Sequence, residues 1–235
     1  MLPEATMERL AFIRYLYNIA VEQSRQPEPI SSGSVLTFHD SIELFLQLAC
    51  EHLDVGIKEP RFMEYWELLS PKLKEGELAE KESIRRLNSS RVELKHHGTF
   101  PSKLSIEAFR ASATNFFELN TPLVFGIEFG SISMVNLVRC VEAKSSLKEA
   151  ETLIQEGRRE DALDKIAIAF AEVVDDYENR RRDRFGDSPF FFGESLAFES
   201  SFFLGIKDHK FSRFVDKVKD SIEAIQSAMR ILSLG

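Results

Sequence analysis

Residues 35–53 read VLTFHDSIELFLQLACEHL, and this stretch decides the fold. Its apolar residues recur at three- and four-residue steps, which is the period of an α-helix. They cover a wider face than a single stripe, as in a helix that is buried on several sides: Leu36, Ile42, Leu44, Phe45, Leu48, Ala49 and Leu53. The stretch therefore predicts a central core helix against which other helices pack.

Helical patterns continue on both sides of this core helix. Residues 10–21 carry apolar side chains at helical spacing, and the pattern ends before Pro27. Beyond the core helix, the same reasoning predicts further helices at residues 61–69, 77–97 and 105–119. Gly98 and Pro101 provide a stop after residue 97. The sequence thus predicts an all-α protein whose first domain, residues 1–122, is an antiparallel helical bundle.

Residues 130–235 are predicted to form a second helical region, either separate from the first or packed on it as one unit. The preceding stretch 123–134, LVFGIEFGSISM, is expected to mark the boundary, as a short strand pair or as a loop buried by its aromatic residues. Two helices broken at Gly157 follow. Their turn, EGRREDAL, resembles a tetratricopeptide-type hairpin, but a single copy favours a plain helical hairpin.

The end of the chain combines an irregular stretch with a final helix. Residues 180–205 alternate phenylalanines with turn-forming residues, which predicts a loop packed over the helices. Residues 211–232 place apolar side chains on one helical face and end without a polar tail. This face predicts an interface with a protein partner, or a chain that continues into a further C-terminal domain.

Composition and charge limit the functions that the chain can have. An apolar content of 43% is enough for a real core. The 30 basic and 38 acidic residues give a net charge of −8, so the protein as a whole repels nucleic acid and contact with RNA must use a local basic cluster. No signal-peptide pattern and no long uncharged apolar window occur, which predicts a cytoplasmic protein without membrane contact.

The cysteines and the known motifs give no sign of a cofactor. Cys50 and Cys140 lie inside apolar runs and are predicted to be buried thiols of a reducing compartment. No phosphate-binding glycine loop, nucleophile elbow or zinc-binding motif is found. The sequence therefore predicts neither a cofactor nor a metal ion.

One cluster at a helix end could carry chemistry. Residues 88–101 read NSSRVELKHHGTFP, with four residues between Arg91 and His96 and five between Arg91 and His97. Arginine donates two parallel hydrogen bonds to phosphate oxygens, and the C-terminal end of a helix favours a protonated histidine. Such groups suffice to cleave RNA without metal, since they supply a base, an acid and a cation for the phosphorane.

This pattern resembles the HEPN family, whose members carry Arg-x4-6-His at the end of a core helix. Residues 37–53 resemble the family's second long helix, in which an acidic residue faces the Arg-His helix, a place that Asp40 and Glu43 occupy here. The resemblance covers roughly residues 5–120. It implies an RNA-cleaving toxin or antiviral defence protein that acts as a homodimer, with Arg91, His96 and His97 as catalytic candidates.

Neighbouring polar residues complete the predicted site. Asn88 belongs to the same segment, and Lys95, Arg85 and Arg86 add local positive charge. Five residues along an ideal helix rotate by about 500°, so Arg91 and the first histidine lie about 140° apart. The last turn must therefore unwind, or the site must be shared across a dimer.

Simpler roles for the same residues stay open. The two adjacent histidines can cap the helix end, and Arg91 can be a structural partner of Asp40 or Glu43. Active HEPN members usually have a polar residue after the arginine, whereas this chain has Val92, which favours a non-catalytic interaction or sensor module. The isolated histidines are expected in the core or in solvent: His39, His52 and His209. The basic run at residues 180–184 is expected mainly to form salt bridges, with nucleic-acid binding as the alternative.

Overall fold

The computed structural model describes residues 2–56, 60–181 and 204–232, apart from the side chains of residues 230–232. Within these ranges the chain forms eight α-helices, several short 3-10 helices and no strand, which confirms the predicted all-α class. The chain divides into two compact units, Met1–Arg139 and Cys140–Gly235, and each is described by itself. The described helices include none that is long and apolar enough to cross a membrane.

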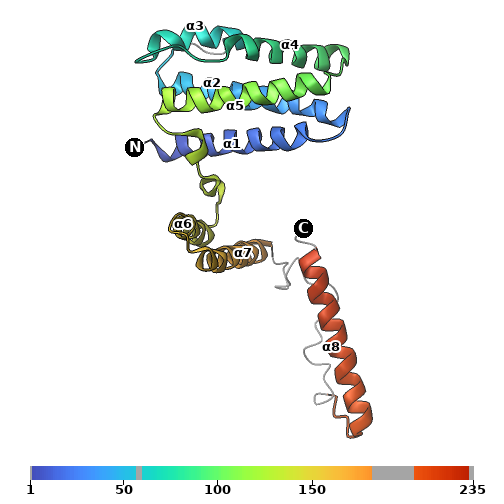
Figure 1. The fold of residues 1–235 in the computed structure, drawn as a ribbon. Coiled ribbons are helices and arrows are strands. Elements are labelled where there is room, and N and C mark those ends of the chain that lie inside the picture. The colour runs from blue at the N-terminus through green and yellow to red at the C-terminus, as the bar shows by residue number, and fades with distance from the viewer. Residues whose placement is uncertain (1, 57–59, 182–203, 233–235) are drawn as a thin grey trace. The chain divides into compact units, whose positions relative to one another are not determined.

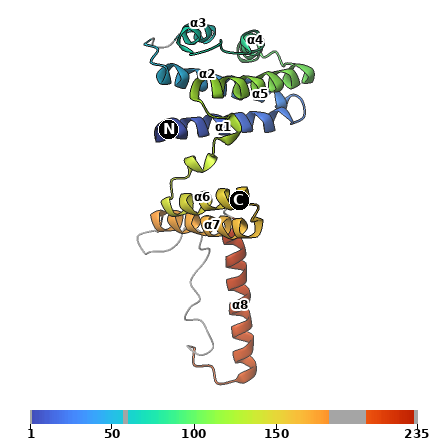
Figure 2. The ribbon, with the colours of Figure 1, turned by 60° about the vertical axis from the view of Figure 1, so that its left-hand side comes forward.

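The first unit contains five helices, four of them long: α1 (Glu4–Ser24), α2 (Gly33–His52), α3 (Tyr65–Leu69), α4 (Lys81–His97) and α5 (Lys103–Phe125). The four long helices run alternately in opposite directions (Figure 1). In both views α2 and α5 form a middle layer, with α1 on one side and α4 on the other (Figures 1 and 2). Helix α2 packs against α1, α4 and α5, so it is the central helix that the sequence predicts.

Aromatic side chains fill the space between the two helices of the middle layer. Phe45 of α2 meets Phe116, Phe117 and Phe125 of α5 edge-on, with ring centroids 5.3, 5.7 and 5.4 Å apart. The rings of Phe45, Phe116 and Phe117 are fully buried. Removing one such side chain from water contributes about 1.5 to 3 kcal/mol, and edge-to-face contact adds to this. This aromatic core fixes the helix on which Asp40 and Glu43 lie.

The end of α4 is set by a glycine, as predicted. Gly98 has a φ of 68°, a conformation that is costly for residues with a Cβ, and its N–H donates to the Leu94 carbonyl at 3.2 Å. The next helix begins at once, because Ser102 caps it by accepting a hydrogen bond from the Ser105 N–H. Helix α4 therefore keeps regular helical structure through His97.

Helix α5 is longer than predicted. It continues through Pro122 to Phe125, although proline removes one helical hydrogen bond. Burial of Val124 and Phe125 favours the extra turn, and the Gly126 N–H closes it on the Pro122 carbonyl at 2.9 Å. The end predicted at residue 119 was therefore too early.

The segment after α5 belongs to the first unit and contains no strand pair. It forms the 3-10 helices η4 (Phe129–Ser131) and η5 (Met134–Leu137), and η5 packs on α1. Phe129 stacks on Phe117 with ring centroids 4.6 Å apart. The alternative of a loop buried by its aromatic residues is the correct one, and the first unit ends at Arg139 rather than at residue 122.

A buried asparagine links the start of α4 to α5. The Asn120 Oδ1 accepts a hydrogen bond from the Ala79 N–H at 2.8 Å, and its Nδ2 donates to the Phe116 carbonyl at 2.8 Å. Asn120→Ala leaves the Ala79 N–H without this acceptor, so we expect a loss of about 1 to 3 kcal/mol in the free energy of unfolding, measured by urea denaturation. Asn115→Ala, on the exposed side of the same helix, serves as the control and is expected to change stability little. Equal losses in the two variants would contradict this account.

The second unit contains the predicted helical hairpin. Helix α6 (Val141–Gln155) packs against α7 (Arg159–Arg181), and Gly157 in the turn between them has a φ of 79°. The last helix, α8 (His209–Leu232), matches the predicted final helix within two residues at its start. One face of α8 exposes large apolar side chains, which we call the α8 stripe: Phe211, Phe214, Val218, Ile222, Ile225 and Met229. The predicted Phe-rich loop lies largely outside the described residues.

Candidate functional site

A buried histidine lies where α2 meets α4. His39 of α2 is only 2% exposed, and its Nε2 is 3.0 Å from the Oδ1 of Asn88 on α4. Phe62, from the 3-10 helix η2 (Phe62–Glu64), stacks on the imidazole with ring centroids 4.2 Å apart. The ring is thus held on one face by an aromatic side chain and at one nitrogen by an amide.

The other ring nitrogen of His39 faces two carboxylates from its own helix. Its Nδ1 is 3.6 Å from Asp40 Oδ1 and 3.8 Å from Glu43 Oε2, distances too long for hydrogen bonds. This buried nitrogen has no hydrogen-bond partner. The two carboxylates reach solvent, with side chains 61% and 37% exposed.

Burial and Arg91 both act on the protonation of His39. Desolvation lowers the pKa of His39 from its ordinary value, and the positive charge of Arg91 lowers it further. The charges of Glu43 and Asp40 raise the pKa, as does the hydrogen bond with Asn88, but burial dominates. Burial therefore favours the neutral form of the imidazole. We call these five residues the His39 cluster: His39, Asp40, Glu43, Asn88 and Arg91.

The His39 cluster contains four of the seven site residues that the sequence predicts. Asp40 and Glu43 come from α2, while Asn88 and Arg91 come from α4 at helical positions that follow the buried Ile84 and Leu87. Arg91 is half-buried, and no ion pair within 4.0 Å joins it to Asp40 or Glu43. The guanidinium therefore acts on the cluster through its field and is not a salt-bridge partner of either carboxylate.

The remaining predicted residues lie apart from this cluster. Lys95, His96 and His97 are exposed in the last turn of α4. This turn does not unwind, so on a regular helix Arg91 and His96 diverge by about 140°. The regular helix thus contradicts the predicted alternative in which the last turn unwinds to bring the two residues together.

His39 is the member of the cluster that the sequence interpretation missed. His39 lies in the core, which is one of the two environments expected for it. It is not isolated, however, because it contacts other polar side chains. A histidine and an acidic residue four positions later lie on one face of a helix, and His39 and Glu43 carry that signal. Its partner Asn88 lies 49 residues away, a contact that no local spacing indicates.

The basic run of the second unit pairs locally where it is described. Arg180 contacts Asp176 at 2.8 Å, and the guanidinium of Arg181 lies 4.9 Å from the ring centroid of Tyr177. Both interactions stay within α7, which agrees with the predicted ion-pairing role for Arg180. Arg182 and Arg184 lie outside the described residues. Cys50 and Cys140 are buried thiols, as predicted.

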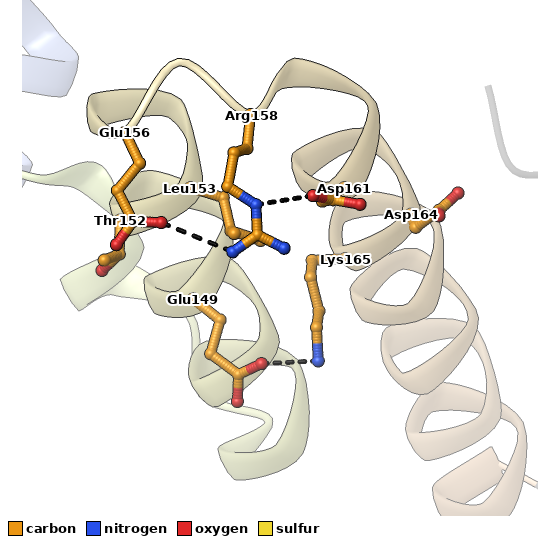
Figure 3. Close-up of a pocket in the computed structure, with 8 residues that line it drawn as sticks. All are labelled: Glu149, Thr152, Leu153, Glu156, Arg158, Asp161, Asp164 and Lys165. Carbon is orange, nitrogen blue, oxygen red and sulfur yellow. Dashed lines mark hydrogen bonds and ion pairs between the residues drawn. The ribbon is translucent and has the colours of Figure 1, made fainter.

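A pocket lies on the α6–α7 hairpin, and both of its basic side chains are paired with acidic side chains of the hairpin (Figure 3). Lys165 contacts Glu149 at 2.5 Å, and Arg158 contacts Asp161 at 2.7 Å and Glu156 at 3.5 Å. Figure 3 shows Glu149 of α6 directed toward Lys165 of α7, and Arg158, in the turn between the two helices, directed toward Asp161. These ion pairs therefore stabilise the packing of the hairpin. The His39 cluster is the stronger candidate for a functional site.

No protein-family model, curated protein or solved structure matches this chain. Function must therefore be argued from the helix arrangement and from the residues at the α2–α4 contact.

Proposed function

We propose that the chain is a metal-independent endoribonuclease of the HEPN toxin or defence type, whose Arg-His site is completed by two copies of the chain. The observation that carries this proposal is the placement of α4. One side of this helix holds Arg91 half-buried beside α2, and its last turn exposes His96 and His97. A second copy that faces this helix end would supply the histidine that Arg91 lacks on its own side.

The chemistry at such a shared site uses only protein groups. One histidine removes the proton of the 2′-hydroxyl, and the resulting oxygen attacks the adjacent phosphorus. Arg91 donates hydrogen bonds to the phosphoryl oxygens as charge develops on them. The same histidine, now protonated, returns this proton to the departing 5′-oxygen, which leaves one product with a 2′,3′-cyclic phosphate and the other with a 5′-hydroxyl.

Local positive charge on α4 supports RNA binding, although the net charge of the protein is negative. Lys95 is exposed one position before the two histidines, and Arg85 and Arg86 are exposed on the same helix. Arg85 shares its charge with Glu82 at 3.3 Å, which is a weak exposed pair. The proposal therefore expects binding through few phosphate contacts, with affinity that falls as salt rises.

We expect the purified dimer to cleave single-stranded RNA in excess EDTA, because Arg91, His96 and His97 need no metal to act. The products should carry 2′,3′-cyclic phosphates, which mass spectrometry of short oligonucleotide products identifies. Arg91→Ala protein, purified in the same way, is the control for contaminating ribonuclease. Loss of cleavage on chelation would show that a metal performs the chemistry and would refute a metal-independent site.

A second candidate function is an interaction module without cleavage. The observation that favours it is apolar exposure in the second unit: the α8 stripe is exposed, and so are several apolar side chains of α7, among them Leu163, Phe170 and Val173. Apolar patches of this kind usually bind another protein. Val92 in place of the usual polar residue agrees with this function. Failure of the dimer to cleave any RNA tested would favour it.

A further inference from the structure

We propose that His39, Asp40 and Glu43 bind a divalent transition-metal ion of the zinc type through His39 Nδ1 and one oxygen of each carboxylate. Each of these residues offers a ligand atom, and the three atoms lie within 4.8 Å of one another. The inference does not rest on the proposed ribonuclease function, because metal binding is measured without RNA.

The buried ring nitrogen of His39 is the observation that points to a cation. Oδ1 of Asn88 can only accept, so His39 Nε2 carries a proton and donates it at 3.0 Å. A neutral ring then leaves the buried Nδ1 as a lone pair beside two carboxylate oxygens, without a hydrogen-bond partner. A metal ion between Nδ1 and the two oxygens would satisfy this lone pair and both negative charges.

The spacing of the three atoms suits a small ion. Zinc binds histidine nitrogen and carboxylate oxygen at about 2.0 to 2.2 Å, so tetrahedral ligand atoms lie about 3.4 Å apart. The observed distances from Nδ1, 3.6 Å to Asp40 and 3.8 Å to Glu43, are close to this value, and the ligand atoms of the two carboxylates lie within 4.8 Å of each other. Three protein ligands leave a fourth position open to water, which the exposure of both carboxylates allows.

Two neighbours of the three ligand residues affect metal binding: Asn88, which contacts the histidine ring, and Arg91, whose charge competes with a cation. A metal-binding histidine usually donates its other N–H to an acceptor that fixes the ring, and Asn88 has this role here. Arg91, whose charge acts on the same ring, disfavours a second cation. With a neutral imidazole, the two carboxylates and this guanidinium sum to one negative charge, which leaves the site attractive to a divalent ion.

The test is calorimetric titration of zinc chloride into the full chain after treatment with a chelator. We expect one tight site per chain, and at least a tenfold rise in Kd in the double variant Asp40→Asn, Glu43→Gln, both of whose changes lie at solvent-reaching side chains. Asn88→Ala should raise Kd about 10- to 100-fold.

Glu93→Gln removes an exposed carboxylate on α4 and serves as the control that should leave Kd unchanged. Arg91→Ala should tighten binding, because it removes the competing charge.

Two further titrations distinguish the proposed site from other ways in which the chain could bind a cation. The exposed pair His96 and His97 is a plausible zinc ligand set by itself, so the variant with both replaced by alanine must keep the tight site. Magnesium chloride should bind far more weakly than zinc, since imidazole suits zinc and not magnesium. Absence of zinc binding, equal binding by the double carboxylate variant, loss of binding in the double histidine variant, or equal affinity for magnesium would each overturn the proposal.

Discussion

His96→Ala lowers the rate of RNA cleavage by about 100-fold or more and leaves the fold intact, if this residue is the general acid that the proposed site requires. The side chain is exposed at the end of α4, so its loss removes only a favourable interaction with the helix terminus. Such a loss shifts Tm by a few degrees at most. Cleavage rates and Tm values of the same preparations therefore separate a catalytic role from a capping role.

His97→Ala is the matched control, because it removes the same kind of side chain one position later on the same exposed turn. We expect it to keep most of the activity, since His96 lies one residue further from the helix end and is better held. Activity lost in His97→Ala but kept in His96→Ala would show that the five-residue spacing is the functional one. Activity kept in both variants would leave the helix end with a capping role only.

Arg91→Ala belongs to the same comparison and should cost about 100- to 1,000-fold in rate, because it removes the donor to the developing phosphorane charge. Arg91 is half-buried beside His39, so this variant can also lose stability. Arg91→Lys keeps the charge but not the two-pronged donor, and it should retain the fold while cleaving poorly. If Arg91→Ala fails to fold and both histidine variants stay active, Arg91 has a structural role and the proposed catalytic site is refuted.

The helices were predictable because burial repeats along them. The wide apolar face of residues 35–53 identified α2, and Gly98 identified the end of α4, where a positive φ is required. The end of α5 was predicted at residue 119, whereas the helix continues through Pro122 to Phe125. Buried Phe125 continues the helix past this proline, and burial beyond a proline is a tertiary effect that no local rule contains.

The candidate site was predictable only in part, for a similar reason. Asp40, Glu43, Asn88 and Arg91 could be proposed from a family resemblance, and they do gather at one helix contact. His39 was not recognised as their centre: its spacing to Glu43 is a local signal, but its burial and its contact with Asn88 depend on how α2 packs against α4. The separation of Arg91 from the two histidines follows from helical geometry alone and was expected.

The measurement that tests the shared site most directly is complementation between inactive subunits. Arg91→Ala and His96→Ala proteins, each nearly inactive alone, should recover activity when mixed and allowed to exchange subunits. If each site takes its arginine from one chain and its histidine from the other, every mixed dimer has one intact site of two. Random pairing then gives about a quarter of the wild-type rate. A mixture as inactive as its two components, with subunit exchange verified by mass spectrometry, would contradict a site built by two copies of this chain.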